Sequence, residues 1–234
     1  MSSPSSRSRA TEPPAPQPAS GPGLARRLAI RFVLRPVVRF LLGVDVAGRE
    51  WLPATGPAIV APNHNSHLDV LVVMAAMPGA ALARVRPVGA ADTFLGGPPA
   101  LRLLARFLGV IPLDRAPTRE TAAGATGALL EALGRGEILV VFPEGTRGDP
   151  EAQKPVKSGL SRLAQASGAP IHPVLIQGAG RSLPRGSRLL VPFTCSVLCG
   201  PPIDPAGLDR PAIMAAYGEA MDGLRAAAPP LHWT

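Results

Sequence analysis

A polar turn between two apolar runs, residues 62–69, constrains the fold of this chain more than any other stretch. The apolar run 58–61 before it and the run 70–74 after it predict a buried strand, a turn and then a helix. His64 falls before the predicted helix and Asp69 just inside it, so the carboxylate can hold the imidazole from behind. A histidine oriented in this way is suited to act as a general base toward a hydroxyl group.

The same residues also fit a simpler interpretation. Ser66 followed by Asp69 matches a capping box, in which both side chains bond backbone N–H groups of the first helical turn. Asp69 would then be a helix start signal, and His64 an ordinary turn residue. The two interpretations are compatible if Ser66 is the N-cap, with one carboxylate oxygen of Asp69 capping the helix and the other facing His64.

Strand-like and helical segments alternate from residue 45 onward, which predicts an α/β fold with a mostly parallel central sheet flanked by helices. The predicted strands are 44–47, 58–61, 84–90, 110–115, 137–142, 171–176 and 188–199, and the predicted helices are 69–78, 99–108, 118–133, 158–167 and 209–227. Pro112 places strand 110–115 at a sheet edge or a bulge. With 234 residues, the chain suits one such domain, residues 45–234, preceded by extra segments.

The N-terminal part divides into two predicted segments. Residues 1–23 are rich in Ser, Pro, Ala and Arg and predict a disordered tail. In residues 24–44, arginines recur at every fourth position among large apolar residues, as Arg27, Arg31, Arg35 and Arg39 with Arg26 beside them. This pattern is typical of a basic amphipathic helix lying on an anionic membrane surface, with Pro36 kinking or dividing it. The alternative is an ordinary packed helix whose arginines face solvent.

The overall charge narrows the possible partners. The formal net charge is +8, which permits nucleic acid, an anionic membrane or a phosphorylated substrate. Aromatic residues make up only 4% of the chain and no nucleic-acid motif is recognisable, so we expect no nucleic-acid partner. No apolar run reaches the roughly 18 residues of a transmembrane helix. Cys195 and Cys199 do not form a disulfide framework and predict a reducing compartment. We therefore expect a peripheral protein on the cytoplasmic face of the cell membrane.

Cations gather in the loops that follow three predicted strands. Residues 142–147 follow the strand predicted to be most central, where Gly145 lets backbone amides approach an anion and Arg147 offers a two-pronged donor. Arg115 follows strand 110–115, and Lys154 and Lys157 precede the helix predicted at residue 158. Together with the His64–Asp69 pair, these loops favour an anionic substrate.

Four segments resemble the glycerolipid (lysophospholipid) acyltransferases, the family of the bacterial 1-acylglycerol-3-phosphate acyltransferases. Residues 63–69 resemble that family's N-H-x-x-x-x-D motif, and residues 142–147 match its F-P-E-G-T-R motif letter for letter. Residues 109–115 resemble G-x-x-F-x-x-R, with Pro112 where Phe is common, and residues 171–174 resemble the last block. The four segments follow the family order over about residues 44–200.

The resemblance implies a mechanism. His64 would deprotonate the acceptor hydroxyl, oriented by Asp69, and the acceptor would attack the thioester of an acyl-CoA or an acyl carrier protein. Two groups of residues would hold the acceptor's phosphate: Glu144, Gly145, Thr146 and Arg147 in one motif, and Arg115 in another. No metal and no cofactor is implied. The expected acceptor is 1-acylglycerol-3-phosphate, giving phosphatidic acid, and a lyso-ornithine lipid or another lysolipid remains open. The resemblance assigns no role to His172.

Two rival classes are less well supported by the sequence. A metal-dependent hydrolase would use His64, His67 and Asp69 as ligands, but only His172 and His232 remain as further histidines. A non-catalytic module that binds a membrane or nucleic acid would account for the charge. It would not account for the His64–Asp69 pair.

Overall fold

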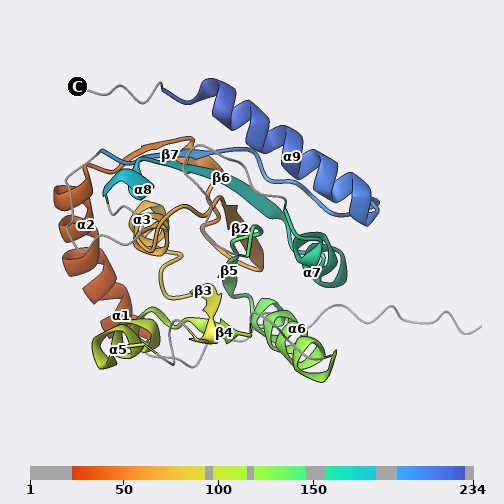
Figure 1. The fold of residues 1–234 in the computed structure, drawn as a ribbon, viewed down its shortest axis with the longest axis horizontal. Coiled ribbons are helices and arrows are strands. Elements are labelled where there is room, and N and C mark those ends of the chain that lie inside the picture. The colour runs from red at the N-terminus through yellow and green to blue at the C-terminus, as the bar shows by residue number, and fades with distance from the viewer. Residues whose placement is uncertain (1–22, 93–96, 115–118, 146–155, 183–193, 230–234) are drawn as a thin grey trace, which may run out of the picture.

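The computed structural model describes residues 23–92, 97–114, 119–145, 156–182 and 194–229. Within these residues, one seven-stranded sheet has the order β1-β7-β6-β2-β5-β3-β4 (Figure 1). The strands are β1 (Asp45–Ala47), β2 (Ala58–Pro62), β3 (Val85–Ala90), β4 (Ile111–Leu113), β5 (Ile138–Val140), β6 (Ile171–Gln177) and β7 (Ser196–Cys199). The helices are α1 (Gly23–Ala29), α2 (Arg35–Leu42), α3 (Asp69–Ala76), α5 (Pro99–Leu108), α6 (Arg119–Gly134), α7 (Gly159–Ser167), α8 (Ala179–Ser182) and α9 (Arg210–Ala227).

The predicted fold class is confirmed. β2 pairs in parallel with both β5 and β6, and β3 pairs in parallel with both β5 and β4. β7 is antiparallel to β6, and β1 is parallel to β7, so the sheet is mostly parallel. Every residue of β2 is buried, as expected of a strand with partners on both sides and helices on both faces. β4, which contains Pro112, lies at the edge of the sheet as predicted.

Helices cover both faces of the sheet, so the core has two parts. On one face, residues of α2, α3, α5 and α8 pack against alternate residues of the strands, such as Val60 of β2. On the other face, α6, α7 and α9 pack against the intervening residues of the strands, such as Ile59 of β2 (Figure 1). Tyr217 of α9 also donates a hydrogen bond from its hydroxyl to the carbonyl of Ala61, at 3.2 Å. The last helix of the chain therefore supports the end of the central strand.

Several predicted ends differ from the observed ones. Helix α9 begins after Asp209, whose carboxylate accepts from the N–H of Ala212 at 2.8 Å, as expected of an N-cap. The predicted long strand 188–199 includes residues outside the described part of the chain, and its described part forms the short strand β7. Residue 118, the first residue of the predicted helix 118–133, also lies outside the described residues, as does the predicted tail apart from Gly23.

Pro36 does not end the N-terminal helix. Between α1 and α2, residues Ile30–Leu34 form a π-helical segment, η1, in which the N–H of Arg35 reaches the carbonyl of Ile30. Pro36 then lies in the first turn of α2, directly after this wider turn. A single wider turn thus accommodates the proline without an intervening loop.

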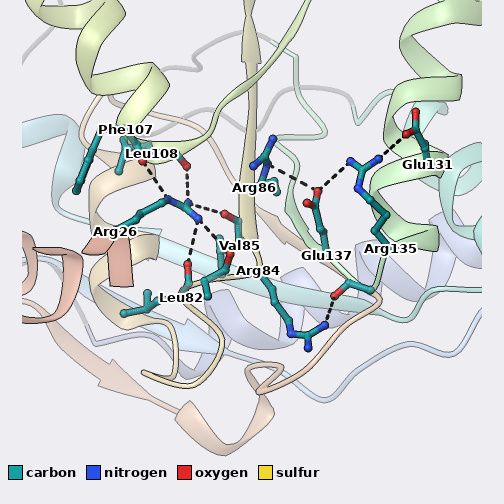
Figure 2. Close-up of polar contacts among 12 residues, drawn as sticks. Arg26, Leu82, Arg84, Val85, Arg86, Phe107, Leu108, Glu131, Arg135 and Glu137 are labelled. Carbon is teal, nitrogen blue, oxygen red and sulfur yellow. Dashed lines mark hydrogen bonds and ion pairs between the residues drawn. The ribbon is translucent and has the colours of Figure 1, made fainter. Parts of the chain in front are cut away.

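Arg26 joins the N-terminal helix to the domain (Figure 2). Only 5% of the residue is exposed. Its guanidinium donates to five backbone carbonyls, those of Phe107 (3.0 Å), Leu82 (3.3 Å), Ala83 (3.3 Å), Val85 (2.7 Å) and Leu108 (2.5 Å). Phe107 and Leu108 end α5, where carbonyls lack intrahelical partners. Burial lowers the pKa of Arg26 to about 10, and the nearby Arg86 contributes in the same direction.

This arrangement corrects the predicted arginine stripe. Arg35 also turns inward and donates to the carbonyls of Ala75 (3.0 Å) and Met77 at the end of α3. Arg31 and Arg39 are exposed, whereas Arg27 is half-buried. The stripe is not wholly exposed, because Arg26 and Arg35 reach carbonyls at the ends of α5 and α3, where helices leave backbone acceptors without intrahelical donors.

Candidate active site

The segment that carries His64 is fixed to the sheet by Asn63. Its side-chain amide donates to the carbonyl of Ile176 at 3.0 Å, and its side-chain oxygen accepts from the N–H of Ile176 at 2.7 Å. The buried asparagine side chain thus takes the place of a pair of backbone hydrogen bonds at the point where β2 stops pairing with β6. We did not predict this role from the sequence. No local sequence pattern indicates this role, because the partner of Asn63 lies 113 residues away.

His64 and Asp69 form the predicted pair. The imidazole Nδ1 lies 2.9 Å from Oδ2 of Asp69, whose side chain is 1% exposed, compared with 19% for His64. The same carboxylate oxygen accepts the backbone N–H groups of Asn65 (2.7 Å) and Ser66 (2.8 Å). In neutral imidazole, a carboxylate at Nδ1 selects the tautomer with its proton there. The lone pair of Nε2 is then available as a base.

The capping interpretation is also partly confirmed. The bond from the N–H of Ser66 to Asp69 is one half of a capping box. The other half differs, because Ser66 Oγ accepts from the N–H of Leu68 at 3.3 Å instead of that of Asp69. The expected division of roles between the two carboxylate oxygens is wrong, since Oδ2 makes both kinds of contact. Oδ1 is buried and has no hydrogen-bond partner among the described residues.

Glu144 lies directly behind His64, in the loop that follows β5. Its Oε1 accepts the backbone N–H of His64 at 3.2 Å, and the residue is 9% exposed. Phe142, from the same loop, packs its ring against the imidazole with 4.3 Å between centroids. Burial raises the pKa of Glu144, while the hydrogen bond from His64 opposes that shift. Glu144 therefore positions the loop of His64, a contact that the resemblance did not imply.

We expect Glu144→Gln to stabilise the fold in a pH-dependent way. The glutamine oxygen can still accept from His64, and the buried charge is removed. Because the pKa of Glu144 is raised from 4.5, the ionised form destabilises the folded chain above the raised pKa, and this penalty disappears below about pH 4.5. The melting temperature of the variant should therefore exceed that of the wild type at pH 8 and match it at pH 4.

The control for this experiment is Glu219→Gln, which removes an exposed carboxylate on α9. It should change the melting temperature little at either pH. A Glu144→Gln variant that is less stable than the wild type at pH 8 would show that the charge itself supports the fold.

The structure describes only part of the predicted phosphate site. Gly145 adopts a left-handed conformation with φ at 69°, and its N–H donates to the carbonyl of Phe142 at 3.1 Å. Thr146, Arg147 and Arg115 lie outside the described residues. β2 and β5 are parallel neighbours, so their carboxyl ends bring His64, Asp69, Glu144 and Gly145 to one edge of the sheet.

His172 and the two cysteines are buried away from the His64–Asp69 pair's contacts. His172 Nδ1 donates to the carbonyl of Trp51 at 2.6 Å, which holds the short 3-10 helix Arg49–Trp51 against β6. Burial lowers the pKa of His172. Cys195 and Cys199 are buried and not joined in a disulfide, and burial raises the pKa of Cys199 to about 12. Across the described ranges, no group of three or more His, Cys, Asp or Glu side chains is arranged to hold a metal ion.

The fold and this pair define an α/β protein with a hydrogen-bonded histidine and aspartate at the carboxyl end of its central strand. The sequence model of the Acyltransferase family matches residues 43–177, more than half of the chain. The chain belongs to the Acyltransferase family.

Individual relatives are similar over most of the described domain. The chain is 29% identical over 181 residues to the human 1-acyl-sn-glycerol-3-phosphate acyltransferase alpha, which covers 75% of this chain and 62% of the relative. It is 28% identical over 150 residues to the chloroplastic 1-acyl-sn-glycerol-3-phosphate acyltransferase BAT2 of Brassica napus, covering 62% of this chain and 40% of that protein. The chain therefore spans less than two thirds of these relatives.

A solved structure shares the fold. The crystal structure of the 1-acyl-sn-glycerophosphate acyltransferase of Thermotoga maritima superposes with a TM-score of 0.66, covering 88% of this chain and 84% of that one. The two sequences are 23% identical. This similarity includes the mostly parallel sheet and its flanking helices.

Proposed function

We propose that the protein transfers a fatty acyl group from a thioester to the free hydroxyl of a lysophospholipid. The proposed acceptor is 1-acylglycerol-3-phosphate, the product phosphatidic acid, and the donor acyl-CoA or an acyl carrier protein. The observation that carries this proposal is the contact of 2.9 Å between His64 and Asp69 at the end of the central strand. The names of the relatives support the choice of acceptor.

In the proposed reaction, Nε2 of His64 removes the proton from the acceptor hydroxyl as its oxygen attacks the thioester carbonyl. Asp69 stabilises the imidazolium that forms and keeps the ring in its orientation. When the carbon–sulfur bond breaks, the imidazolium returns the proton to the leaving thiolate. The products are an ester and a free thiol, and no acyl-enzyme intermediate forms. Arg115, Gly145, Thr146 and Arg147 are proposed to hold the acceptor phosphate.

An acceptor panel tests this proposal. The full chain is incubated with acyl-CoA or acyl carrier protein and with 1-acylglycerol-3-phosphate, monoacylglycerol or a lyso-ornithine lipid. Thiol release and the acylated lipid are both measured. We expect turnover with the phosphorylated acceptor. Hydrolysis that proceeds without a thioester donor and is lost after dialysis against a chelator would instead support a metal-dependent hydrolase. An absence of turnover with every pair of donor and acceptor would overturn the proposal.

We further propose that the N-terminal helix rests on an anionic membrane surface. Its outward side is apolar, with Phe40 90% exposed. We define the apolar face as the exposed large apolar residues of this helix: Leu24, Leu28, Phe32, Val33, Val37, Phe40 and Leu41. Residues 23–44 contain no acidic residue, and Arg31 and Arg39 are exposed beside the apolar face. Cations near an anionic leaflet contribute about 1 kcal/mol each. In the part of the chain that the structure describes, no helix is long and apolar enough to cross a membrane.

We expect Phe32→Asp combined with Phe40→Asp to release the protein from anionic vesicles. The double variant removes two of the most exposed apolar contacts and adds negative charge, so vesicle flotation should fall to background. Arg31→Gln combined with Arg39→Gln should weaken flotation only partly, as high salt does, because salt screens charges over about 10 Å at 0.1 M. A wild-type protein that stays in the aqueous phase at low salt would contradict this expectation.

These substitutions are better tests than deletion of the helix. Ile30, Val38 and Leu42 are buried in the core, and Arg26 holds five carbonyls, so removing the segment would damage the domain as well. Phe32 and Phe40 are exposed, and changing them should leave the melting temperature nearly unchanged.

A further inference from the structure

Lys157 approaches the candidate site from outside its predicted motifs. It lies two residues before α7, and its backbone N–H donates to the carbonyl of Pro143 at 3.0 Å. Pro143 belongs to the loop that carries Glu144 and Gly145. Lys157 therefore lies against the loop that contacts His64, although it follows Pro143 by more than ten residues in the sequence.

The ammonium of Lys157 occupies the space above Gly145. A Cβ built on Gly145 would lie 2.7 Å from Nζ and 2.9 Å from Cε of Lys157, closer than real Cβ contacts. Gly145 also has φ at 69°, a conformation that disfavours other residues. The absence of a side chain at residue 145 thus makes room for a cation in the loop that also carries Glu144, whose carboxylate accepts the backbone N–H of His64.

This cation has no counter-charge in the described part of the chain. Lys157 is exposed, and no ion pair joins its Nζ to a carboxylate there. It is also one of only two lysines in a chain with 24 basic residues, so its chemistry differs from that of its many arginines. A lysine ammonium is a compact charge with three donors, which suits a phosphate in a confined space.

We propose that Lys157 binds a phosphate group of a substrate beside Gly145. This inference rests on the proposed acyl transfer, which supplies two phosphate-bearing substrates. One is the acceptor, through the phosphate of 1-acylglycerol-3-phosphate, and the other is the donor, through the phosphates of CoA. Both present the same oxygen acceptors to the ammonium. Lys157 acts as a specificity-determining residue, because it favours substrates that carry the phosphate.

Kinetics of Lys157→Gln distinguish the two sources. The acceptor is supplied with its phosphate or as monoacylglycerol, and the donor as acyl-CoA or as acyl-pantetheine, giving four pairs. We expect kcat/KM to fall about 10-fold to 100-fold for pairs that carry the bound phosphate and to change little for pairs that lack it. If the acceptor supplies the phosphate, the loss follows the acceptor. If CoA supplies it, the loss follows the donor.

A matched control is Arg162→Gln, which removes an exposed cation from α7, five residues further along the chain. It should behave as the wild type with all four pairs. A loss in Lys157→Gln that is equal for all four pairs, or no loss at all, would overturn the inference. Failure of the wild type with every pair would instead overturn the proposed function.

A binding experiment tests Lys157 independently of turnover. Reductive methylation with ¹³C-labelled formaldehyde marks both lysines without removing their charge, and Lys154→Arg assigns the two NMR signals. We expect the Lys157 signal to shift saturably with glycerol 3-phosphate or with CoA, and glycerol alone to leave it unchanged. A Lys157 signal that responds to neither phosphate compound contradicts the inference.

Discussion

Replacing His64 with alanine is expected to lower kcat for acyl transfer by about 10²-fold to 10⁴-fold, the contribution of a positioned general base. The fold should survive, because His64 is partly exposed and lies in a loop outside the core. Asp69 keeps its bonds from the N–H groups of Asn65 and Ser66 when the imidazole is removed. Thiol release measures the activity, and thermal unfolding measures the stability.

Two further variants separate the possible roles of this loop. His67→Ala removes an exposed histidine three residues away and should retain activity, whereas a hydrolase that used His67 as a metal ligand would lose it. Asp69→Asn keeps an oxygen that can accept from Asn65 and Ser66 but cannot stabilise an imidazolium by charge. It should therefore remain folded and lose most of its activity. Turnover near that of the wild type would leave Asp69 with only its capping role.

Replacing Arg26 with methionine is expected to destabilise the protein by about 3–5 kcal/mol, because each buried acceptor left without its donor costs about 1–3 kcal/mol. Five carbonyls lose a donor at once, and two of them end α5. Since small domains have about 5–15 kcal/mol of stability in total, the variant should unfold at a much lower urea concentration.

The neighbouring Arg27→Met provides the control, because it removes the same charge and the same side-chain type from a half-buried position on the same helix. Its free energy of unfolding should stay within about 0.5 kcal/mol of the wild type, as for most surface changes. Equal urea midpoints for Arg26→Met and Arg27→Met would show that water replaces the guanidinium without loss.

The sequence was most informative where structure depends on near neighbours. His64 and Asp69 are five residues apart, so the strand, turn and helix around them were enough to predict their contact. The start of α9 was likewise predicted to within one residue, and Asp209 caps it through a residue three positions away. Strand order was not predictable in this way, and the antiparallel pairing of β7 depends on contacts between distant segments.

Polar residues with distant partners were the main source of error. Arg26 stands beside the recurring Arg27, Arg31, Arg35 and Arg39, yet Arg26 and Arg35 bind backbone carbonyls up to 82 residues away. Composition and spacing are the same for a guanidinium in solvent and for one that caps the end of another helix. Likewise, the pairing of Asn63 with Ile176 spans 113 residues and leaves no local pattern. For Arg115, Thr146 and Arg147, the phosphate site remains a prediction.

The position of β2 between β5 and β6 has a consequence for biosynthesis. Its partners are translated long after it, and at about 5–20 residues per second the 113 residues between Asn63 and Ile176 take roughly 6–23 s to make. Until β5 is made, this entirely apolar strand has neither neighbour, and until β6 is made it still lacks one, which favours its capture by a chaperone or by another nascent chain. The loop that carries His64 then takes its final shape only after β6, and later Tyr217 of α9, have been made. Slower translation or a lower temperature during expression should therefore change the yield of folded protein more than the activity of each folded molecule.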